Sequence, residues 1–177
     1  MKKIAVLLLS ILVLLILASC SPTSYLKITS TSSNGAFVEA KDYGKVPSSL
    51  SIPSSIDGYK IIGISGLAFE KCEKLKRVKV PDGVTKICNG AFYGCYNLTW
   101  ISLPSSLEQI GYGNTYEEYK DFGGCYKLSV IEFRGTREQW KKIKDTHYDE
   151  IKRASQLVGS GAQEITVRCT DGTITLW

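Results

Sequence analysis

The most constraining feature of this chain is an internal repeat with a period of 23 residues. The segment LAFEKCEKLKRVKVPDGVTKI starts at Leu67, and GAFYGCYNLTWISLPSSLEQI starts at Gly90. Apolar residues, prolines and cysteines recur in one register, so that Cys72 returns as Cys95. The other matched pairs are Ala68 and Ala91, Phe69 and Phe92, Leu75 and Leu98, Val78 and Ile101, Val80 and Leu103, Pro81 and Pro104, and Ile87 and Ile110. Such a period predicts a solenoid, in which stacked repeats bury one another's apolar side chains.

Weaker copies of the repeat flank these two units. The upstream segment 48–62 (SSLSIPSSIDGYKII) keeps the same apolar order, with extra residues around 57–58. Its matching residues are Leu50, Ile52, Pro53, Ile56 and Ile62. Downstream, the pattern returns at 128–133 after 30 residues, and the seven extra residues lie between Ile110 and Cys125. We therefore expect about four units, with atypical ones at both ends that cap an open core.

Each unit contains one clear strand. Val78-Lys79-Val80 and Ile101-Ser102-Leu103 alternate apolar and polar residues, which is the period of a strand with one buried face. A proline closes each strand, because proline cannot donate to the ladder. The spacing in the rest of the unit also suits a helical face, but Gly90, Gly94 and several β-branched residues favour turns and a short second strand.

The chain has six cysteines, of which five remain after Cys20. Cys72, Cys95 and Cys125 occupy one column of the repeat, so each is expected to face inward as a small apolar residue. A disulfide between column neighbours is the alternative, since export permits disulfides. We favour buried thiols, because the column belongs to the packing pattern. Cys88 and Cys169 have no predicted partner.

The sequence predicts no enzyme, no metal site and no cofactor. His147 is the single histidine and there is no C-x-x-C pair, which argues against zinc. A Cys–His nucleophile needs both groups in contact with an orienting partner, and nothing in the sequence specifies one. The carboxylates are scattered, and the 16 glycines show no phosphate-loop spacing. The net charge of +5 is a mild excess, whereas nucleic-acid binding would require a concentrated basic stripe, so we expect no nucleic-acid partner. We also expect no small-molecule substrate.

The first 20 residues are expected to be a targeting segment. Lys2 and Lys3 precede an apolar run from Ile4 to Leu17, which is too short to span a bilayer comfortably. The cysteine that follows Leu-Ala-Ser resembles the lipobox of bacterial lipoproteins, and this resemblance implies cleavage before Cys20 and lipid attachment to it. The alternatives are an uncleaved anchor or an ordinary signal peptide. Removal of the leader lowers the net charge to +3.

Caps are expected at both ends of the repeat array. Thr136 with Gln139 forms a capping box that starts a helix. Trp140, Ile143, His147, Ile151 and Ala154 fall near one face of that helix. Asp171-Gly172 between alternating segments predicts a hairpin at 165–176, and a second hairpin is expected at 25–40. The resulting division is a signal peptide (1–19), a lipidated cysteine and tether (20–26), an N-terminal cap (27–47), repeats (48–135) and a C-terminal cap (136–177).

The repeat resembles the BspA-like, or treponemal-type, leucine-rich repeat. The residues that carry the resemblance follow the order L-x-x-[IV]-x-[VL]-P-x-x-[VL]-x-x-I-x-x-x-A-F-x-x-C. The opening IPSSIDGYKIIGI and the ending FRGTREQWKKI with ITVRCTDGTI are also similar to that family, over roughly Lys27 to Trp177. Cys88, where glycine is usual, and Asp121, where alanine is usual, depart from the pattern. The resemblance implies a leucine-rich-repeat solenoid of the β-rich horseshoe type, with a C-terminal helix and hairpin as cap.

Two functions are compatible with these features. The resemblance favours an envelope-anchored lipoprotein that binds a protein ligand, such as a host extracellular protein or a bacterial surface protein, and so mediates adhesion. The alternative is a periplasmic or structural envelope scaffold with no external ligand. Both place the mature protein in the bacterial cell envelope, held to its membrane by a lipid anchor, and the first places it on the outer surface.

The expected ligand site is the concave strand face of the solenoid. Stacking aligns Ser49, Arg77, Trp100 and Val130 in one outward column, and Ser51, Lys79, Ser102 and Glu132 in the next. We expect Arg77, Lys79, Trp100, Ser102 and Glu132 to contact the ligand, with Trp100 at the centre, because tryptophan and arginine are enriched at interface hot spots. The alternative is that Trp100 packs beneath the caps. The enlarged third unit adds a possible binding loop with Tyr112, Tyr116 and Tyr119.

Overall fold

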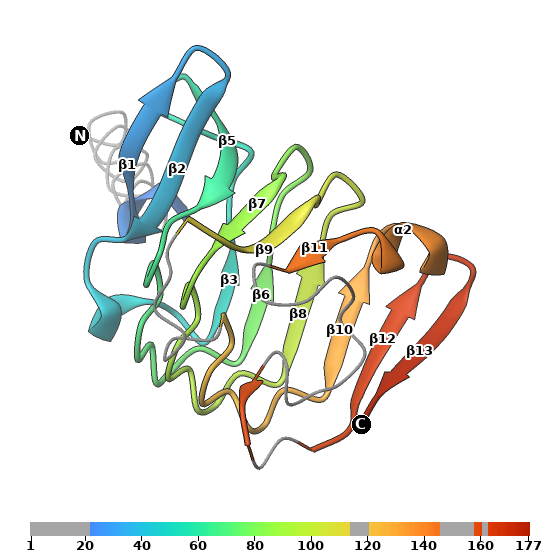
Figure 1. Ribbon diagram of the computed structural model, residues 1–177. Coiled ribbons are helices and arrows are strands. Elements are labelled where there is room, and N and C mark those ends of the chain that lie inside the picture. The colour runs from blue at the N-terminus through green and yellow to red at the C-terminus, as the bar shows by residue number, and fades with distance from the viewer. Residues whose placement is uncertain (1–21, 114–120, 146–157, 161–162) are drawn as a thin grey trace, which may run out of the picture.

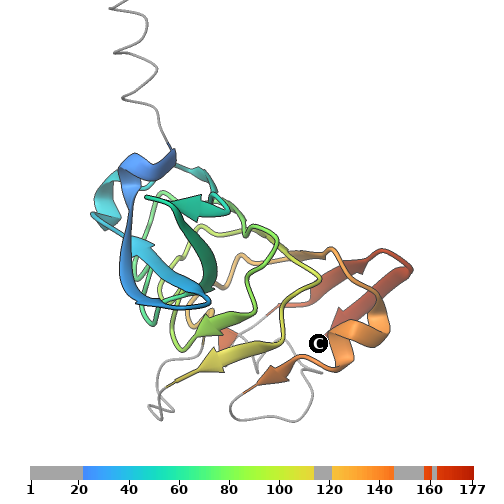
Figure 2. The ribbon, with the colours of Figure 1, turned by 90° about the horizontal axis from the view of Figure 1, so that it is seen from above.

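The computed structural model describes residues 22–113, 121–145, 158–160 and 163–177. The repeats wind into a solenoid of about four turns, and successive turns add strands to two sheets (Figure 1). The N-terminal hairpin and the C-terminal helix lie at opposite ends of the molecule, as Figure 2 shows. The predicted leader and Cys20 lie outside the described residues. Within the described part of the chain, no helix combines the length and the apolar character needed to cross a membrane.

The first sheet collects the N-terminal hairpin and the second strand of each turn. Its order is β1-β2-β5-β7-β9-β11, with β4 paired to β5 outside this path. The β7–β9 pairing is parallel, which confirms the predicted short second strand of the repeat unit. The strands are β1 (Leu26–Ser32), β2 (Gly35–Ala40), β4 (Ser55–Ile56), β5 (Tyr59–Ile64), β7 (Lys86–Cys88), β9 (Gln109–Tyr112) and β11 (Lys144–Asp145).

The second sheet collects the strand of each turn that ends at a proline or an equivalent position. Its order is β13-β12-β10-β8-β6-β3, and all pairings are parallel except the terminal hairpin β12–β13. The strands are β3 (Ser49–Ser51), β6 (Arg77–Lys79), β8 (Trp100–Leu103), β10 (Val130–Phe133), β12 (Ile165–Cys169) and β13 (Gly172–Leu176). Two short 3-10 helices, η1 (Pro22–Tyr25) and η2 (Tyr43–Lys45), lie at the N-terminal end.

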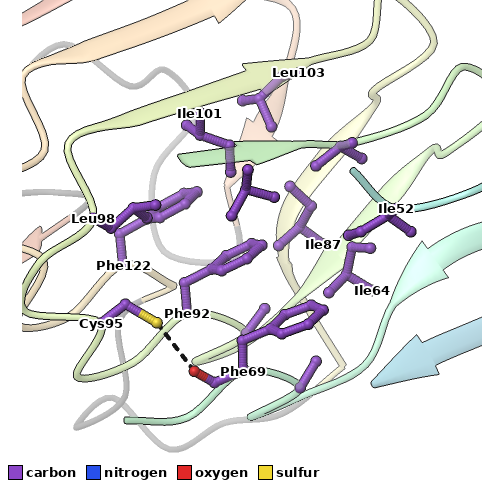
Figure 3. Close-up of a cluster of buried hydrophobic side chains, with 14 of the residues drawn as sticks. Ile52, Ile64, Phe69, Ile87, Phe92, Cys95, Leu98, Ile101, Leu103 and Phe122 are labelled. Carbon is purple, nitrogen blue, oxygen red and sulfur yellow. Dashed lines mark hydrogen bonds between the residues drawn. The ribbon is translucent and has the colours of Figure 1, made fainter. Parts of the chain in front are cut away.

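One apolar core runs through the whole solenoid and is built from columns of equivalent residues. The three phenylalanines of the Ala-Phe positions stack, with ring centroids 5.3 Å apart for both Phe69–Phe92 and Phe92–Phe122 (Figure 3). Their side chains are completely buried, and stacked aromatic rings stabilise the folded state beyond the contribution of the apolar area that they bury. Other fully buried columns are Leu75, Leu98 and Leu128; Val78, Ile101 and Ile131; and Val80, Leu103 and Phe133.

The cysteine column is part of this core. Cys72, Cys95 and Cys125 are fully buried, and all five cysteines in the described residues are free thiols, which confirms the predicted thiol ladder. The Cys95 thiol donates to the carbonyl of Phe69 one turn earlier at 3.0 Å (Figure 3). The Cys125 thiol donates to the carbonyl of Phe92 at 3.1 Å. The thiols of Cys95 and Cys125 therefore each join two successive turns.

The N-terminal cap is the expected hairpin. β1 and β2 pair antiparallel, and β2 then pairs parallel with β5, so the hairpin covers the first turn of the solenoid. The extra residues at 57–58 form the tight turn of a small β4–β5 hairpin, with positive φ at Asp57 and Gly58. This hairpin shifts the register of the first unit: Ile64, not the predicted Ile62, pairs with Ile87.

The C-terminal cap contains the predicted capping box but a shorter helix. The helix α2 (Arg137–Lys141) begins with reciprocal hydrogen bonds between Thr136 and Gln139. The expected continuation past Lys142 is wrong, because Lys144–Asp145 form the strand β11 and pair with β9. Buried Ile143 thus belongs to a further turn of the solenoid rather than to a helical face. His147, Ile151 and Ala154 lie outside the described residues.

The C-terminal hairpin has the predicted strands and extends the second sheet. β12 pairs parallel with β10, and β13 pairs antiparallel with β12 (Figure 1). Ile165, Val167 and Leu176 are buried and continue the core past the last repeat. The hairpin therefore covers the last turn and also widens the outward face of the sheet by two strands.

Candidate functional site

The outward face of the second sheet carries the predicted columns in the predicted register. Residues 49, 77, 100 and 130 are successive ladder partners, and residues 51, 79, 102 and 132 form the neighbouring column. The residue between the two columns in each strand is buried (Leu50, Val78, Ile101 and Ile131), so the column positions on either side of it point away from the core. The hairpin extends the first column with Thr166 and Thr175 and the second with Arg168 and Thr173.

Arg77 and Trp100 form the main feature of this face. The Arg77 guanidinium carbon lies 4.2 Å from the centroid of the Trp100 ring, which is the geometry of a cation–π contact. Arg77 is exposed and Trp100 is partly exposed. Trp100 therefore does not pack beneath the caps, which was the alternative position. The stacked pair presents a flat, amphipathic surface whose two side chains are already held in place.

Lys79 and Glu132 flank this pair in the second column. Lys79 is exposed on β6, and Glu132 is partly exposed on β10, two turns away. Arg168 continues the column on β12 and is exposed. Arg77, Lys79 and Arg168 give the face a positive character, with Glu132 as a negative position between them.

The expected exposure of Ser102 is wrong. Ser102 is only 1% exposed, because the side chain of Arg134 lies over it. The Arg134 guanidinium donates to the Ser102 hydroxyl at 2.6 Å, to the Val80 carbonyl at 2.8 Å and to an Asp82 carboxylate oxygen at 2.9 Å. Arg134 thus spans three turns on the outside of the sheet and removes Ser102 from the accessible surface.

Sequence reasoning missed Arg134 because its position carries no alternation signal. It directly follows β10 in the FRG segment, which was assigned to the family's ending rather than to the ligand face. The contact between the Ser102 hydroxyl and the long Arg134 side chain could have been predicted only from the pairing register of β8 and β10.

The base of the enlarged third unit contains one of its three predicted tyrosines. Tyr112 ends β9 and is 38% exposed, with the ammonium nitrogen of Lys86 3.9 Å from its ring centroid. Tyr116 and Tyr119 lie outside the described residues. The possible binding loop therefore remains a prediction, with Tyr112 held against the first sheet at one end of it.

The described residues contain no group of three or more His, Cys, Asp or Glu side chains that could hold a metal ion. Two of the thiols, Cys72 and Cys88, are also poor nucleophiles. Burial raises the pKa of Cys88 to about 11. The hydrogen bond between Cys72 and Cys95, together with burial, raises the pKa of Cys72 far above its usual range. Because the thiolate is the reactive form, Cys72 and Cys88 are suited to packing rather than to covalent chemistry.

Comparisons with known proteins agree with this architecture. A family model described as "BspA type Leucine rich repeat region (6 copies)" matches residues 47–150 of the 177-residue chain. A search among curated proteins finds no match.

Several solved structures are similar to this chain at low identity. The leucine-rich repeat protein of T. pallidum is 21% identical with a TM-score of 0.46, over 71% of this chain and 63% of that one. A leucine-rich repeat protein from Bacteroides ovatus is 24% identical with a TM-score of 0.48, over 82% and 36%. A leucine rich cell surface protein from Faecalibacterium prausnitzii is 22% identical with a TM-score of 0.40, over 64% and 39%. The chain thus spans between 36% and 63% of the length of these proteins.

Proposed function

The chain belongs to the BspA-type leucine-rich repeat family, and on this basis we propose that it is an envelope-anchored protein whose outward strand face binds a protein ligand. Leucine-rich repeat proteins typically serve as non-enzymatic scaffolds for protein–protein interaction, and repeat solenoids present extended binding surfaces. The finer part of the proposal is adhesion to a host protein or to another cell, with Cys20 as the site of lipid attachment.

The observation that carries the proposal is the Arg77–Trp100 pair on the outward face. Tryptophan and arginine are enriched among residues that dominate binding energy, and stacking pre-orders both side chains before a partner arrives. Neither side chain is needed to fill the core, since the buried side of each strand is occupied by Val78 and Ile101. A partly exposed tryptophan in this position favours recognition of a partner.

The size of the face predicts weak single contacts. Six strands at about 4.8 Å spacing give a width of about 24 Å, and strands of three to five residues are about 10–17 Å long. This area is below the roughly 800 Å² per partner of a standard stable interface. Many copies on one membrane would therefore bind by avidity.

A binding experiment on the purified protein tests the site. The double substitution Trp100→Ala with Arg77→Ala is expected to weaken binding to a protein ligand, either a host extracellular protein or a bacterial surface protein, by about tenfold or more. This loss is measured with many copies of the chain immobilised densely on a surface. The matched control is Tyr59→Ala with Lys60→Ala, which removes an exposed aromatic and a cation from the β4–β5 hairpin instead. Unchanged binding of the Trp100/Arg77 variant in both the monomeric and the dense format would move the site away from this face.

A cell experiment tests the display. Protease or antibody added to intact cells should reach the lipoprotein if it lies on the outer surface. Complete protection on intact cells, with digestion after lysis, would support the periplasmic scaffold instead and would contradict adhesion.

A further inference from the structure

A second surface of the solenoid, rich in tyrosine and lysine, lies at the turns rather than on the strands. The turns that carry the Cys-column residues are stacked side by side, at the lower left of Figure 1, through bonds such as Lys71 N–H to Tyr93 O at 2.7 Å. Their exposed tips, together with the neighbouring 3-10 helix η2, form what we call the tyrosine–lysine ridge. Its members are Tyr43, Tyr96, Tyr126, Lys45, Lys71, Lys74 and Lys127.

The ridge exposes three aromatic rings, one from η2 and two from successive repeat turns. Tyr43, Tyr96 and Tyr126 are 40%, 47% and 48% exposed, although tyrosine rings usually pack more deeply. Tyr96 and Tyr126 hold equivalent positions, each directly after a buried column cysteine. From the first to the last tyrosine the ridge covers three rung spacings, or about 14 Å.

Contacts along the ridge tie its members together. The Lys74 ammonium donates to the Gly44 carbonyl at 3.0 Å, and Tyr43 donates to the Leu67 carbonyl at 3.2 Å. The Lys127 ammonium donates to the side-chain oxygen of Asn97 at 2.8 Å. These bonds leave the rings and the ammonium groups at the surface while fixing where they lie, so the ridge is one continuous, ordered strip.

The ridge and the residues beside it carry a surplus of positive charge. Besides the four ridge lysines, Lys41 and Lys76 lie there, against the acidic residues Asp42, Glu70 and Glu73. The surplus of three positive charges equals the whole surplus of the chain without Lys2 and Lys3, so the remaining sequence is electrically neutral. Two of the carboxylates pair with ridge lysines that stay 79% and 60% exposed, Lys45 and Lys71.

One end of the ridge lies close to the segment that follows Cys20 in the sequence. The backbone N–H of Lys41 donates to the Tyr25 carbonyl at 2.8 Å, and its ammonium donates to the Thr23 carbonyl at 3.4 Å. Cys20 precedes Thr23 by three residues, which span at most about 11 Å. A lipid on Cys20 would therefore hold Thr23, and the neighbouring end of the ridge at Tyr43, within a short distance of the bilayer.

We propose that the tyrosine–lysine ridge rests on the anionic lipid surface to which Cys20 attaches the chain; the inference rests on the proposed lipid attachment. Tyrosine is enriched at membrane interfaces because its ring is apolar and its hydroxyl is polar. Lysine stems follow apolar surface while their ammonium groups reach anionic headgroups. Because the ridge lies at the turns, this contact leaves the Arg77–Trp100 face on the strands open to a partner.

Lysine labelling of the intact lipoprotein tests the orientation. The lipoprotein is reconstituted in vesicles of phosphatidylethanolamine and phosphatidylglycerol, and its acetylation by an amine-reactive reagent is compared with that of the unlipidated Cys20→Ser mature chain in solution. Lys71, Lys74 and Lys127 should be labelled about fivefold more slowly on vesicles, while exposed Lys60 and Lys142 keep their rates. Equal protection of both groups, or protection of neither, would overturn the proposal.

A second measurement separates the ridge from the anchor. The unlipidated Cys20→Ser chain should sediment with phosphatidylglycerol vesicles at low salt and not with neutral phosphatidylcholine vesicles. Lys71→Gln with Lys74→Gln and Lys127→Gln should lower this partitioning about tenfold or more. The control removes the same charge with Lys60→Gln, Lys142→Gln and Lys144→Gln and should change it less than twofold. Equal losses, or no vesicle binding by the parent chain, would overturn the ridge proposal whether or not Cys20 is lipidated.

Discussion

Lys71 and Gly94 occupy the same position of successive turns, and both have positive φ, at 52° and 72°. The stem of Lys71 lies over Gly94, so that a Cβ added to Gly94 would lie 2.9 Å from Cγ of Lys71. The same arrangement recurs one turn later, where the ring of Tyr96 lies over Gly124. The left-handed backbone at this position lets each turn stack closely on the next.

Gly94→Ala should therefore destabilise the solenoid by about 1–2 kcal/mol, from the left-handed conformation and the close contact together. Urea denaturation followed by circular dichroism gives the free energy of unfolding. The matched control is Gly113→Ala, which has φ of 97° but nothing within 4 Å of the added Cβ. Equal effects of the two changes would mean that the contact with Lys71 contributes nothing. A partial recovery in Gly94→Ala with Lys71→Ala would assign the difference to that contact.

The sequence predicted the repeat, both hairpins and the outward columns because these depend on local patterns. Alternation of apolar and polar residues sets which side of a strand is buried, and a constant period sets the register between strands. The pairing of residues 77, 100 and 130 followed directly. The Asp-Gly turn at 171–172 marked the C-terminal hairpin for the same local reason.

The failures came from tertiary context. The apolar spacing of Trp140 and Ile143 suits a helix. Pairing of Lys144–Asp145 with the edge strand β9 instead ends the helix and adds a parallel strand to the first sheet. Ser102 followed the strand pattern correctly, yet the long side chain of Arg134 from the next turn covers it. Both effects join residues separated by more than 30 positions, and no local pattern encodes them.

The buried thiols predict a loss of stability at alkaline pH. The pKa of Cys88 in the folded protein is about 11, raised first by burial and then by the charge of Asp121. In the unfolded chain a thiol titrates near its usual value of about 8.5. Between these values the folded state binds more protons, so the free energy of unfolding falls as pH rises through this window. Below it the thiol is protonated in both states and contributes no slope.

Urea unfolding in the presence of a reductant, from pH 7 to pH 10.5, measures this dependence. Cys88→Ala should make the decline above pH 8.5 shallower and leave the profile below pH 8 flat. An unchanged slope in this variant would show that Cys88 is not a source of the dependence. Cys169, whose pKa is also raised by burial, serves as the comparison through Cys169→Ala.

Cys20→Ala tests the proposed lipid attachment independently of the ridge. The protein expressed with its leader in a bacterial host should move from the detergent-rich phase to the aqueous phase in a phase-partition assay, because loss of the acyl chains removes the membrane affinity that they supply. Metabolic labelling with a fatty acid should be lost in parallel. Retention of the Cys20→Ala protein in the detergent-rich phase would identify the apolar run itself as the anchor.

Arg134 joins three turns from outside the core, so its removal should cost more than that of an ordinary surface cation. Its bonds to the Val80 carbonyl and to the buried Ser102 hydroxyl are to partly desolvated groups, and hydrogen bonds from a charged donor contribute about 1.5–3 kcal/mol. Its ion pair with Asp82 is solvent-exposed on the carboxylate side, at 83%, and adds little. Arg134→Ala should therefore lower the free energy of unfolding by about 2 kcal/mol.

Three further substitutions, Asp82→Asn, Arg137→Ala and Ser102→Ala, test this assignment in the same urea experiment. Asp82→Asn should cost less than about 0.5 kcal/mol, since an exposed ion pair is weak. Arg137→Ala, which removes an exposed arginine paired with Asp171, should also have a small effect. Ser102→Ala in the Arg134→Ala background should cost less than Ser102→Ala alone, because the hydroxyl has already lost its donor. Additive losses would mean that Arg134 and Ser102 act separately and that the arginine does not hold the outer turns together through this residue.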